Sequence, residues 1–396
     1  MPQKSELSEY EIRWDWYWIE RYHFFHSRGY RLRPRFHPDH VPTKVDLRVN
    51  WRDDSRARHL RAQIMDAVQI STGKAVMLKW TSRARHPYEV QIASLFSSPE
   101  LQKNPQNHCV PIFEIFPDPL DDDKDIVVMA RMVVFCDAPW RTIGEVVDCF
   151  RQLFEGMQFM HENFVAHRDC ALLNFVVDPS KLYPQGFHPV AHWMSPTMER
   201  GAVTIGRAKC WPSYYIIDFG LSRRYKLDDG PPLEPVRRGA DQTPPEHAGS
   251  SPEPCNPFPT DIYYLGNMIR EDFMKYSHAA PERFDCPSSL RFMLPLIQDM
   301  TRAEPELRPT IGEVVECFRS LCSSLTRWHL LRPPSSLNVF EHAYYSVVQA
   351  KKLITRAPAL PPAALDPPIR PRFVLDDRLR EFFTASRTVD SCNSSI

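Results

Sequence analysis

The chain has 396 residues, which suffices for one large two-lobed domain or two smaller ones. Lys and Arg together number 49, as do Asp and Glu, so no global field attracts nucleic acid or an anionic membrane. The 10 cysteines are scattered without a CxxC pair or a zinc-ligand spacing, which predicts reduced thiols in an intracellular protein of the cytoplasm or nucleus.

The N-terminal region predicts neither a signal peptide nor a membrane span. Several acidic residues occur within the first 20 positions, so no signal peptide is expected to begin here. The most apolar window, residues 126–139, is broken by Arg131 and Asp137 and is too short to cross a bilayer. We therefore expect a soluble protein without a membrane partner.

Residues 1–44 predict a helical extension. Between Tyr10 and Ser27, apolar residues recur at helical spacing, which indicates an amphipathic helix. We expect its apolar stripe to pack on the domain that follows rather than to form a free docking surface.

Residues 45–132 predict a small β-rich lobe. Two strand-like stretches, 60–70 and 74–80, are joined by a glycine turn, and two further strands are expected at 109–116 and 125–132. Between these pairs a helix should open at Pro87. Lys79 lies in the strand sequence VMLKW and Glu89 lies in this helix, with Glu100 as an alternative partner for the lysine.

Residues 133–330 predict a larger helical lobe. A long amphipathic helix, with apolar residues at helical spacing, leads into the sequence HRDCALLN (His167–Asn174). A second short sequence, IIDFG, ends at Gly220. The intervening residues 178–214 hold five prolines and no long periodic run, so we expect a surface insertion there.

Three oxygen-bearing side chains in these two sequences suit chemistry with a hard cation. Asp169 lies five residues before Asn174, and Asp218 follows a short apolar run. Mg²⁺ prefers oxygen ligands and is normally shared with substrate phosphates. This pattern predicts phosphoryl transfer. Cys170, beside Asp169, is either a reactive thiol or a small packing residue.

Together these motifs resemble the eukaryotic protein-kinase superfamily over roughly residues 45–325. HRDCALLN resembles its catalytic loop, IIDFG its DFG motif and VMLKW its third-strand lysine motif. TPPE, ending at Glu246, resembles the end of its activation segment. DIYYLG, beginning at Asp261, and ELRPT, which contains Arg308, resemble two later helical motifs. The lead-in RPRFHPDHVP is similar to kinase-like proteins of expanded fungal families.

The resemblance implies an α+β bilobal fold with ATP and Mg²⁺ as cofactors. Asp169 would orient and deprotonate the substrate hydroxyl, and Asn174 and Asp218 would hold Mg²⁺. Lys79, braced by Glu89, would neutralise charge on the ATP phosphates. Structural roles are implied for the remaining motif residues, with Arg308 paired to Glu246 and Asp261 bonded to the catalytic-loop backbone: His167, Arg168, Phe219, Gly220, Glu246, Asp261 and Arg308.

Two features depart from the kinase pattern. The family folds a glycine-rich loop over the phosphates, yet Gly73 is the only glycine between Val45 and Lys79. Arginines at 56, 58 and 61 either offer cations in its place or merely solubilise a strand edge. Ala171 stands where Ser/Thr kinases usually have Lys, and the tyrosine-kinase signature is also incomplete, although we favour Ser or Thr as the acceptor.

Three functions remain open at this stage. The first is a divergent ATP-dependent protein kinase that transfers the γ-phosphate to a hydroxyl of an unidentified protein. The alternative is a pseudokinase that serves as a binding or scaffold module, and the third is a kinase of a non-protein substrate. Residues 331–396 are expected to form a tail with a helix at 338–354 and a proline-rich stretch at 357–372.

Overall fold

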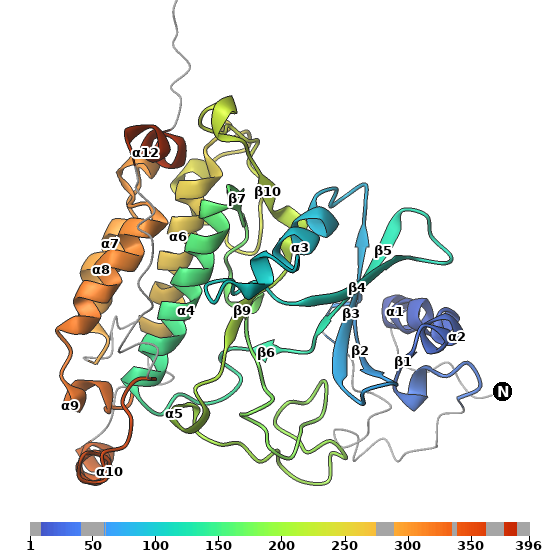
Figure 1. Ribbon diagram of the computed structural model, residues 1–396, viewed down its shortest axis with the longest axis horizontal. Coiled ribbons are helices and arrows are strands. Elements are labelled where there is room, and N and C mark those ends of the chain that lie inside the picture. The colour runs from blue at the N-terminus through green and yellow to red at the C-terminus, as the bar shows by residue number, and fades with distance from the viewer. Residues whose placement is uncertain are drawn as a thin grey trace, which may run out of the picture. The chain divides into compact units, whose positions relative to one another are not determined.

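The fold is mixed α+β and contains a curled antiparallel sheet, which confirms the predicted class (Figure 1). The computed structural model describes residues 9–40, 59, 61–274, 289–334, 339–361 and 376–385. The chain divides into two compact units. The first comprises residues 1–98, 110–133 and 178–205, and the second comprises 99–109, 134–177 and 206–396.

The first unit is built on a five-stranded antiparallel sheet in the order β1-β2-β3-β5-β4. Alternate side chains of the central strand, including Val76 and Leu78, are completely buried on one face. Gly73, in the turn that joins β2 to β3, has a φ of +69°, a conformation that favours glycine. The strand bounds are β1 (Tyr30–Arg31), β2 (Ile64–Gln69), β3 (Ala75–Ser82), β4 (Ile112–Pro117) and β5 (Lys124–Ala130).

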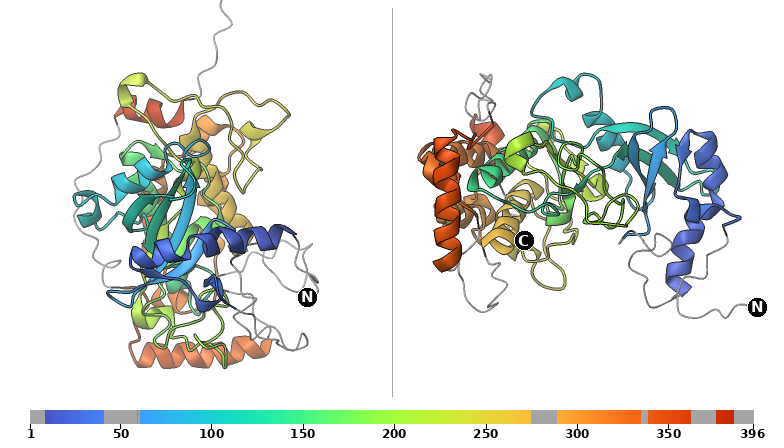
Figure 2. Two further views of the ribbon diagram at one scale, coloured as in Figure 1. Left: turned by 90° about the vertical axis from the view of Figure 1, so that its right-hand side faces the viewer. Right: turned by 90° about the horizontal axis from the view of Figure 1, so that it is seen from below.

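Two N-terminal helices, α1 (Glu9–Glu20) and α2 (Tyr22–Ser27), lie against this sheet (Figure 2). Trp18 and Phe25 are buried in the same apolar cluster as Val76 and Leu78. The packing predicted for the apolar stripe is confirmed for Ile19, Tyr22 and Phe25, whereas Trp16 of the same stripe is 53% exposed. The predicted single helix is divided at Arg21, whose buried guanidinium forms an ion pair with Asp118 at 2.8 Å.

The first unit also contains α3 (Glu89–Phe96) and residues 178–205. Within the latter, Ala191, Met194 and Met198 form a small apolar cluster of their own. The predicted insertion at 178–214 thus spans both units, because residues 206–214 belong to the second. That part includes the short helix α5 (Arg207–Cys210).

The second unit is mainly helical. Its longest helix, α4 (Ile143–Glu162), begins with a capping box in which Thr142 and Glu145 satisfy each other's backbone N–H groups. α4 packs on α8, and α6 and α8 both pack on α7 (Figure 1). The bounds of the other described helices are α6 (Pro257–Ile269), α7 (Leu294–Met300), α8 (Ile311–Ser323), α9 (Arg327–Leu330), α10 (Val339–Ile354) and α12 (Asp377–Thr384).

Short strand pairs hold the loops between these helices. β7 (Val165–Ala166) pairs with β10 (Arg223–Arg224), and β8 (Phe175–Val177) pairs with β9 (Tyr214–Ile216), both antiparallel. β6 (Val133–Val134), where the chain enters the second unit, lies beside β8. Both pairs flank the sequence HRDCALLN, so they fix the two ends of this loop.

The C-terminal helix α12 belongs to the core of the second unit. Phe382 and Phe383 are buried in a cluster with Ala166 and Phe258. The Asn256 side chain donates hydrogen bonds to the backbone oxygens of Phe382 and Ala385, at 3.0 and 3.1 Å. These contacts make residues 376–385 an integral part of the unit rather than a loose tail.

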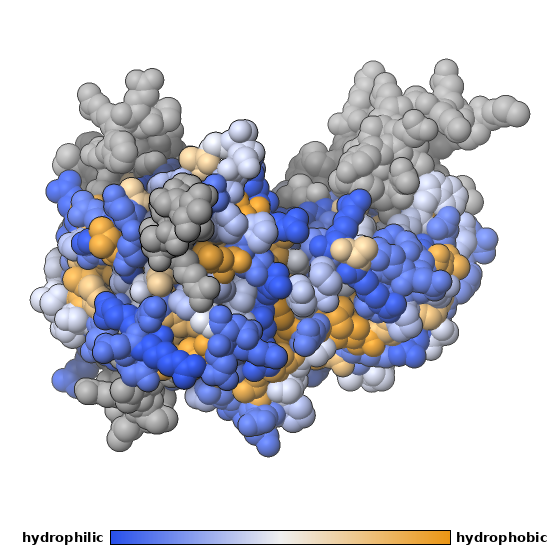
Figure 3. Space-filling model, turned by 90° about the horizontal axis from the view of Figure 1, so that it is seen from above, coloured by the Kyte–Doolittle hydropathy of each residue, from blue (hydrophilic) through white to orange (hydrophobic). Residues whose placement is uncertain are grey.

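The molecular face in Figure 3 carries hydrophobic residues in small groups among hydrophilic ones. The longest described helix, α4, carries several charged residues along its 20 positions. Within the described ranges, no helix combines the length and the apolar character that a membrane crossing requires.

Candidate active site

The centre of the candidate site is the half-buried carboxylate of Asp169. The Asn174 side-chain amide donates to the Oδ2 atom of Asp169 at 2.9 Å and to its backbone oxygen at 2.8 Å. A 3₁₀ turn at Leu172–Asn174 folds the chain back so that residues five apart in sequence meet in this way. The geometry fixes the rotamer of Asp169 and uses the amide nitrogen of Asn174.

The backbone that precedes Asp169 is held by a second carboxylate, Asp261 of α6. The carboxylate of Asp261 is completely buried and accepts hydrogen bonds from the backbone N–H groups of His167 and Arg168, both at 2.7 Å. Arg168 has a φ of +69°, which is unfavourable for a residue with a side chain. The two charge-assisted bonds compensate for this strain.

The strand pair β8–β9 places Asp218 next to the loop. The Ile217 N–H donates to the Asn174 backbone oxygen at 3.0 Å, and the His167 ring lies 3.0 Å from the Ile217 oxygen. Asp218 follows directly, with a φ of +68°. Phe219 is buried with its ring against that of His167. The structure thus brings together Asp169, Asn174 and the backbone of Asp218.

A loop segment that the sequence motifs do not mark passes directly over Asp169. The Ala240 N–H donates to the Oδ1 atom of Asp169 at 2.8 Å. At Gly239, an added Cβ atom would come within 2.3 Å of the same oxygen. Only glycine therefore allows this close approach. The signal in the sequence is a lone Gly239 following two arginines, which is too common to single out.

In the first unit, Lys79 and Glu89 form the predicted ion pair, and both side chains are buried. Lys79 lies at the centre of β3, opposite Ile64 of β2 and Val127 of β5, while Glu89 is the first residue of α3. Thr81, two residues further along β3, donates to the other oxygen of Glu89 at 2.5 Å. Both carboxylate oxygens of Glu89 therefore have a partner, and the ammonium of Lys79 is fixed in position.

The structure describes little of the stretch that replaces the glycine-rich loop. Arg56 and Arg58 lie outside the described residues. Arg61 lines a small pocket together with His59 and Arg33. The suggestion that these arginines substitute for glycines remains a prediction.

The predicted structural pair is present in the second unit. Arg308 donates to both carboxylate oxygens of Glu246, at 2.6 and 2.7 Å. The Thr260 hydroxyl donates to Glu246 at 2.8 Å. This bidentate arrangement ties the end of the loop 218–246 to the loop that precedes α8.

The residues fit a hard cation in their chemistry. Asn174 and Asp218 supply an amide oxygen and a carboxylate, and Mg²⁺ often takes only one or two protein ligands. Among the residues that the structure describes, no cluster of three or more His, Cys, Asp or Glu side chains forms a self-sufficient metal site.

Cys170 is a packing residue rather than a reactive thiol. Its side chain is buried, and its sulfur lies 3.5 Å from an Asp261 oxygen. Burial, reinforced by the charges of Asp261 and Asp169, raises the pKa of the Cys170 thiol well above its ordinary value. A thiol that stays protonated is a poor nucleophile.

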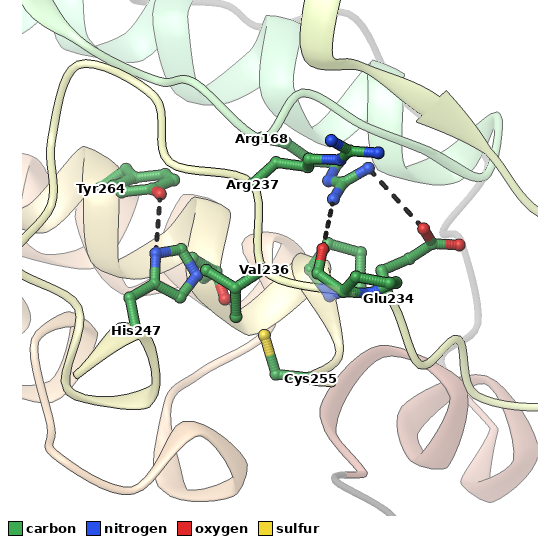
Figure 4. Close-up of a pocket in the computed structure, with 10 residues that line it drawn as sticks. Arg168, Glu234, Val236, Arg237, His247, Cys255 and Tyr264 are labelled. Carbon is green, nitrogen blue, oxygen red and sulfur yellow. Dashed lines mark hydrogen bonds and ion pairs between the residues drawn. The ribbon is translucent and has the colours of Figure 1, made fainter. Parts of the chain in front are cut away.

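A cluster of charged side chains beside the loop His167–Asn174 is not marked by any sequence motif (Figure 4). Glu234 forms an ion pair with Arg223 of β10 at 2.8 Å. It also lies 3.8 Å from the guanidinium of Arg168. Arg168 also donates to the Pro235 backbone oxygen at 3.1 Å. These contacts fasten the middle of the loop 218–246 to the residue that precedes Asp169. No sequence spacing connects the three charged residues.

In comparisons with known proteins, no family model and no curated protein matches this chain. The assignment of function accordingly depends on the geometry described above.

Proposed function

We propose that this chain is a divergent protein kinase that uses ATP and Mg²⁺ to phosphorylate a Ser or Thr hydroxyl. The observation that carries the proposal is the immobilised Asp169 carboxylate, held by Asn174 and by a backbone that Asp261 fixes. A positioned carboxylate of this kind accepts the hydroxyl proton in phosphoryl transfer. The bilobal kinase fold that the motifs imply is part of the same proposal.

The other residues take complementary roles in this proposal. Asn174 and Asp218 would hold Mg²⁺, which neutralises phosphate charge when bound. Lys79, kept in place by Glu89 and through it by Thr81, would bind the phosphates of ATP. Such catalysis consists mostly of positioning and electrostatics, so the absence of a glycine-rich loop weakens it without necessarily removing it.

A pseudokinase is the second candidate, and one observation favours it. Both carboxylate oxygens of Asp169 already accept hydrogen bonds from the chain itself, one from Ala240 and one from Asn174. An incoming hydroxyl has to share or displace one of them. Carboxylate oxygens have two lone pairs each, so sharing is chemically feasible. A non-protein substrate is the third possibility.

The test is transfer of the γ-phosphate from ATP–Mg²⁺ to the protein itself or to a generic protein substrate. Asp169→Asn keeps the side-chain size and removes the base, so we expect loss of transfer with a near-normal melting temperature. Asp299→Asn, which alters an exposed carboxylate on α7, is the matched control and should transfer like the parent. Equal transfer by Asp169→Asn and the parent would remove Asp169 from the mechanism.

Nucleotide binding separates the two main candidates further. A ligand at about 100 times its Kd stabilises a protein by roughly 2.7 kcal/mol. For a protein of this size, that corresponds to a rise in melting temperature of at least about 2 °C. We expect such a rise with millimolar ATP–Mg²⁺ and a smaller one in Asp218→Asn. No rise combined with no transfer would favour the pseudokinase.

A further inference from the structure

Residues 237–241 cover Asp169, so they also lie close to any substrate group that contacts its carboxylate. The Ala240 N–H donates to the Asp169 carboxylate, and a Cβ atom added at Gly239 would overlap with it. A substrate chain whose hydroxyl approaches this carboxylate would therefore lie beside residues 237–241. The side chains of this segment are the first that the flanking residues of a substrate meet.

Two exposed arginines, Arg237 and Arg238, precede Gly239 directly. Arg238 donates to the Gly249 backbone oxygen at 2.7 Å, which orients its guanidinium without neutralising it. In the described part of the chain, neither arginine forms an ion pair with a carboxylate. Their positive charges are thus available to a ligand.

The acidic side chain of the same segment already has partners, because Asp241 accepts hydrogen bonds from the Thr243 hydroxyl and the Asn267 amide. Arg237 lines the same pocket as Arg168 and Glu234 (Figure 4). The one carboxylate in this pocket, Glu234, is already engaged by Arg168 and Arg223.

We infer that the substrate is an acidic protein segment, in which Arg237 and Arg238 bind carboxylate side chains close to the target hydroxyl. This inference rests on the proposed function and names its substrate class. An extended backbone advances by about 3.3–3.6 Å per residue, so Arg237 lies roughly 7 Å along the chain from Gly239. The acidic residues should accordingly lie within about three positions of the acceptor.

The recognition has the properties of exposed ion pairs. Two such contacts give a preference of about tenfold in kcat/KM for an acidic over a neutral peptide, since each contributes modestly in water. The preference should decrease as salt is raised, because exposed charges are screened over about 8 Å at physiological ionic strength. Guanidinium groups bind phosphates as well as carboxylates, so phosphoserine near the acceptor should also be recognised.

The first arm of the experiment measures transfer from ATP–Mg²⁺ to synthetic serine peptides. Five peptides are compared, in which the residues that flank the acceptor serine are alanines, glutamates on the N-terminal side only, glutamates on the C-terminal side only, phosphoserines or lysines. The parent should prefer a glutamate or phosphoserine peptide, and Arg237→Glu with Arg238→Glu should lose this preference. A control with the same change in net charge, Arg302→Glu with Arg319→Glu, replaces exposed arginines elsewhere and should retain it. Transfer without any preference for anionic peptides would overturn the inference.

The second arm measures binding of the same fluorescent peptides without nucleotide, by anisotropy at low and high salt. Tighter binding of anionic peptides, lost in the Arg237 and Arg238 double variant but not in the control, supports the recognition even when no phosphate is transferred. In that case the proposed kinase activity is refuted, but the proposed binding of acidic peptides by Arg237 and Arg238 is supported. Equal binding of acidic and neutral peptides by the parent would overturn the surface independently of catalysis.

Discussion

Arg308→Ala is expected to destabilise the protein strongly. The guanidinium has no exposed surface, and the Glu246 carboxylate it pairs with is only 9% exposed. The substitution leaves Thr260 as the carboxylate's one remaining side-chain partner. Losing one member of a buried pair typically costs about 3–5 kcal/mol. With an unfolding entropy of about 2.1 cal/mol/K per residue, a chain of 396 residues loses roughly 1.2 °C per kcal/mol, so the melting temperature should fall by about 4–6 °C. Arg308 also donates to three backbone oxygens, which the variant leaves without this partner: those of Pro259, Arg302 and Ala303.

The loss of stability caused by Arg308→Ala should depend on pH. Burial alone would raise the pKa of Glu246, but the hydrogen bonds and charge of Arg308 overcome it and hold the pKa below its ordinary value of 4.5. Such a group stabilises the folded state above the unfolded-state pKa, and this contribution is lost as the pH falls through the folded-state pKa. In the variant, burial is opposed only by the Thr260 hydroxyl and a backbone hydrogen bond, so protonating Glu246 relieves much of the cost of the stranded charge. The difference from the parent should shrink between pH 7 and pH 4.

The assay is thermal unfolding followed by circular dichroism, with Arg302→Ala as the matched control. Arg302 is an arginine of the same region whose side chain is 47% exposed and pairs with Asp299 on the surface. Exposed pairs contribute about 0–1 kcal/mol, so this control should melt within about 2 °C of the parent. If Arg308→Ala melts like Arg302→Ala, the reasoning about the buried pair is refuted.

Two further substitutions test other parts of the second unit. Asp272 reaches the surface, but its partial desolvation, followed by the charge of the neighbouring Glu271, raises its pKa to about 6. This carboxylate therefore destabilises the folded state increasingly as the pH rises from about 4 through 6, so Asp272→Asn should raise the melting temperature at pH 7.5 but not at pH 4. The same gain at both pH values would contradict this pKa. Phe382→Ala removes a ring that is 1% exposed and should cost about 3–5 kcal/mol, whereas Phe113→Ala, at a site 52% exposed, should cost under about 1 kcal/mol by chemical denaturation. Equal losses would show that α12 is not part of the core.

The long periodic elements of the fold could be predicted from sequence, because their signals are local. α4 has a capping box and an apolar stripe within its own residues. The division between α1 and α2 could not be predicted, since it accompanies the ion pair of Arg21 with Asp118, which lies 97 positions away. The short helix α12 was also missed, because a helix of eight residues is stable only through tertiary packing.

The candidate site divides in the same way. The pairing of Lys79 with Glu89 was predicted from the resemblance of VMLKW to the third-strand lysine motif of the kinase superfamily and from the helix expected after it. The contacts of Arg308 with Glu246 and of Asp261 with the backbone before Asp169 follow motif positions, whereas the hydrogen bond between Asn174 and Asp169 was not predicted. In contrast, Ala240 reaches Asp169 from 71 positions away through an irregular loop. Neither secondary-structure propensity nor hydrophobic periodicity predicts which part of the protein such a loop will contact.

The position of α12 has a consequence for how the protein is made. Phe258, against which Phe382 and Phe383 pack, leaves the ribosome about 125 residues before them. At typical synthesis rates of about 5–20 residues per second, the apolar surface that these rings cover stays open for roughly 6–25 s. A nascent chain halted before Asp376 would keep it open permanently. We therefore expect chaperones and proteases to bind the exposed apolar surface of a chain that lacks α12. Premature termination near the end of the chain should then lower the amount of folded protein as much as termination in the middle.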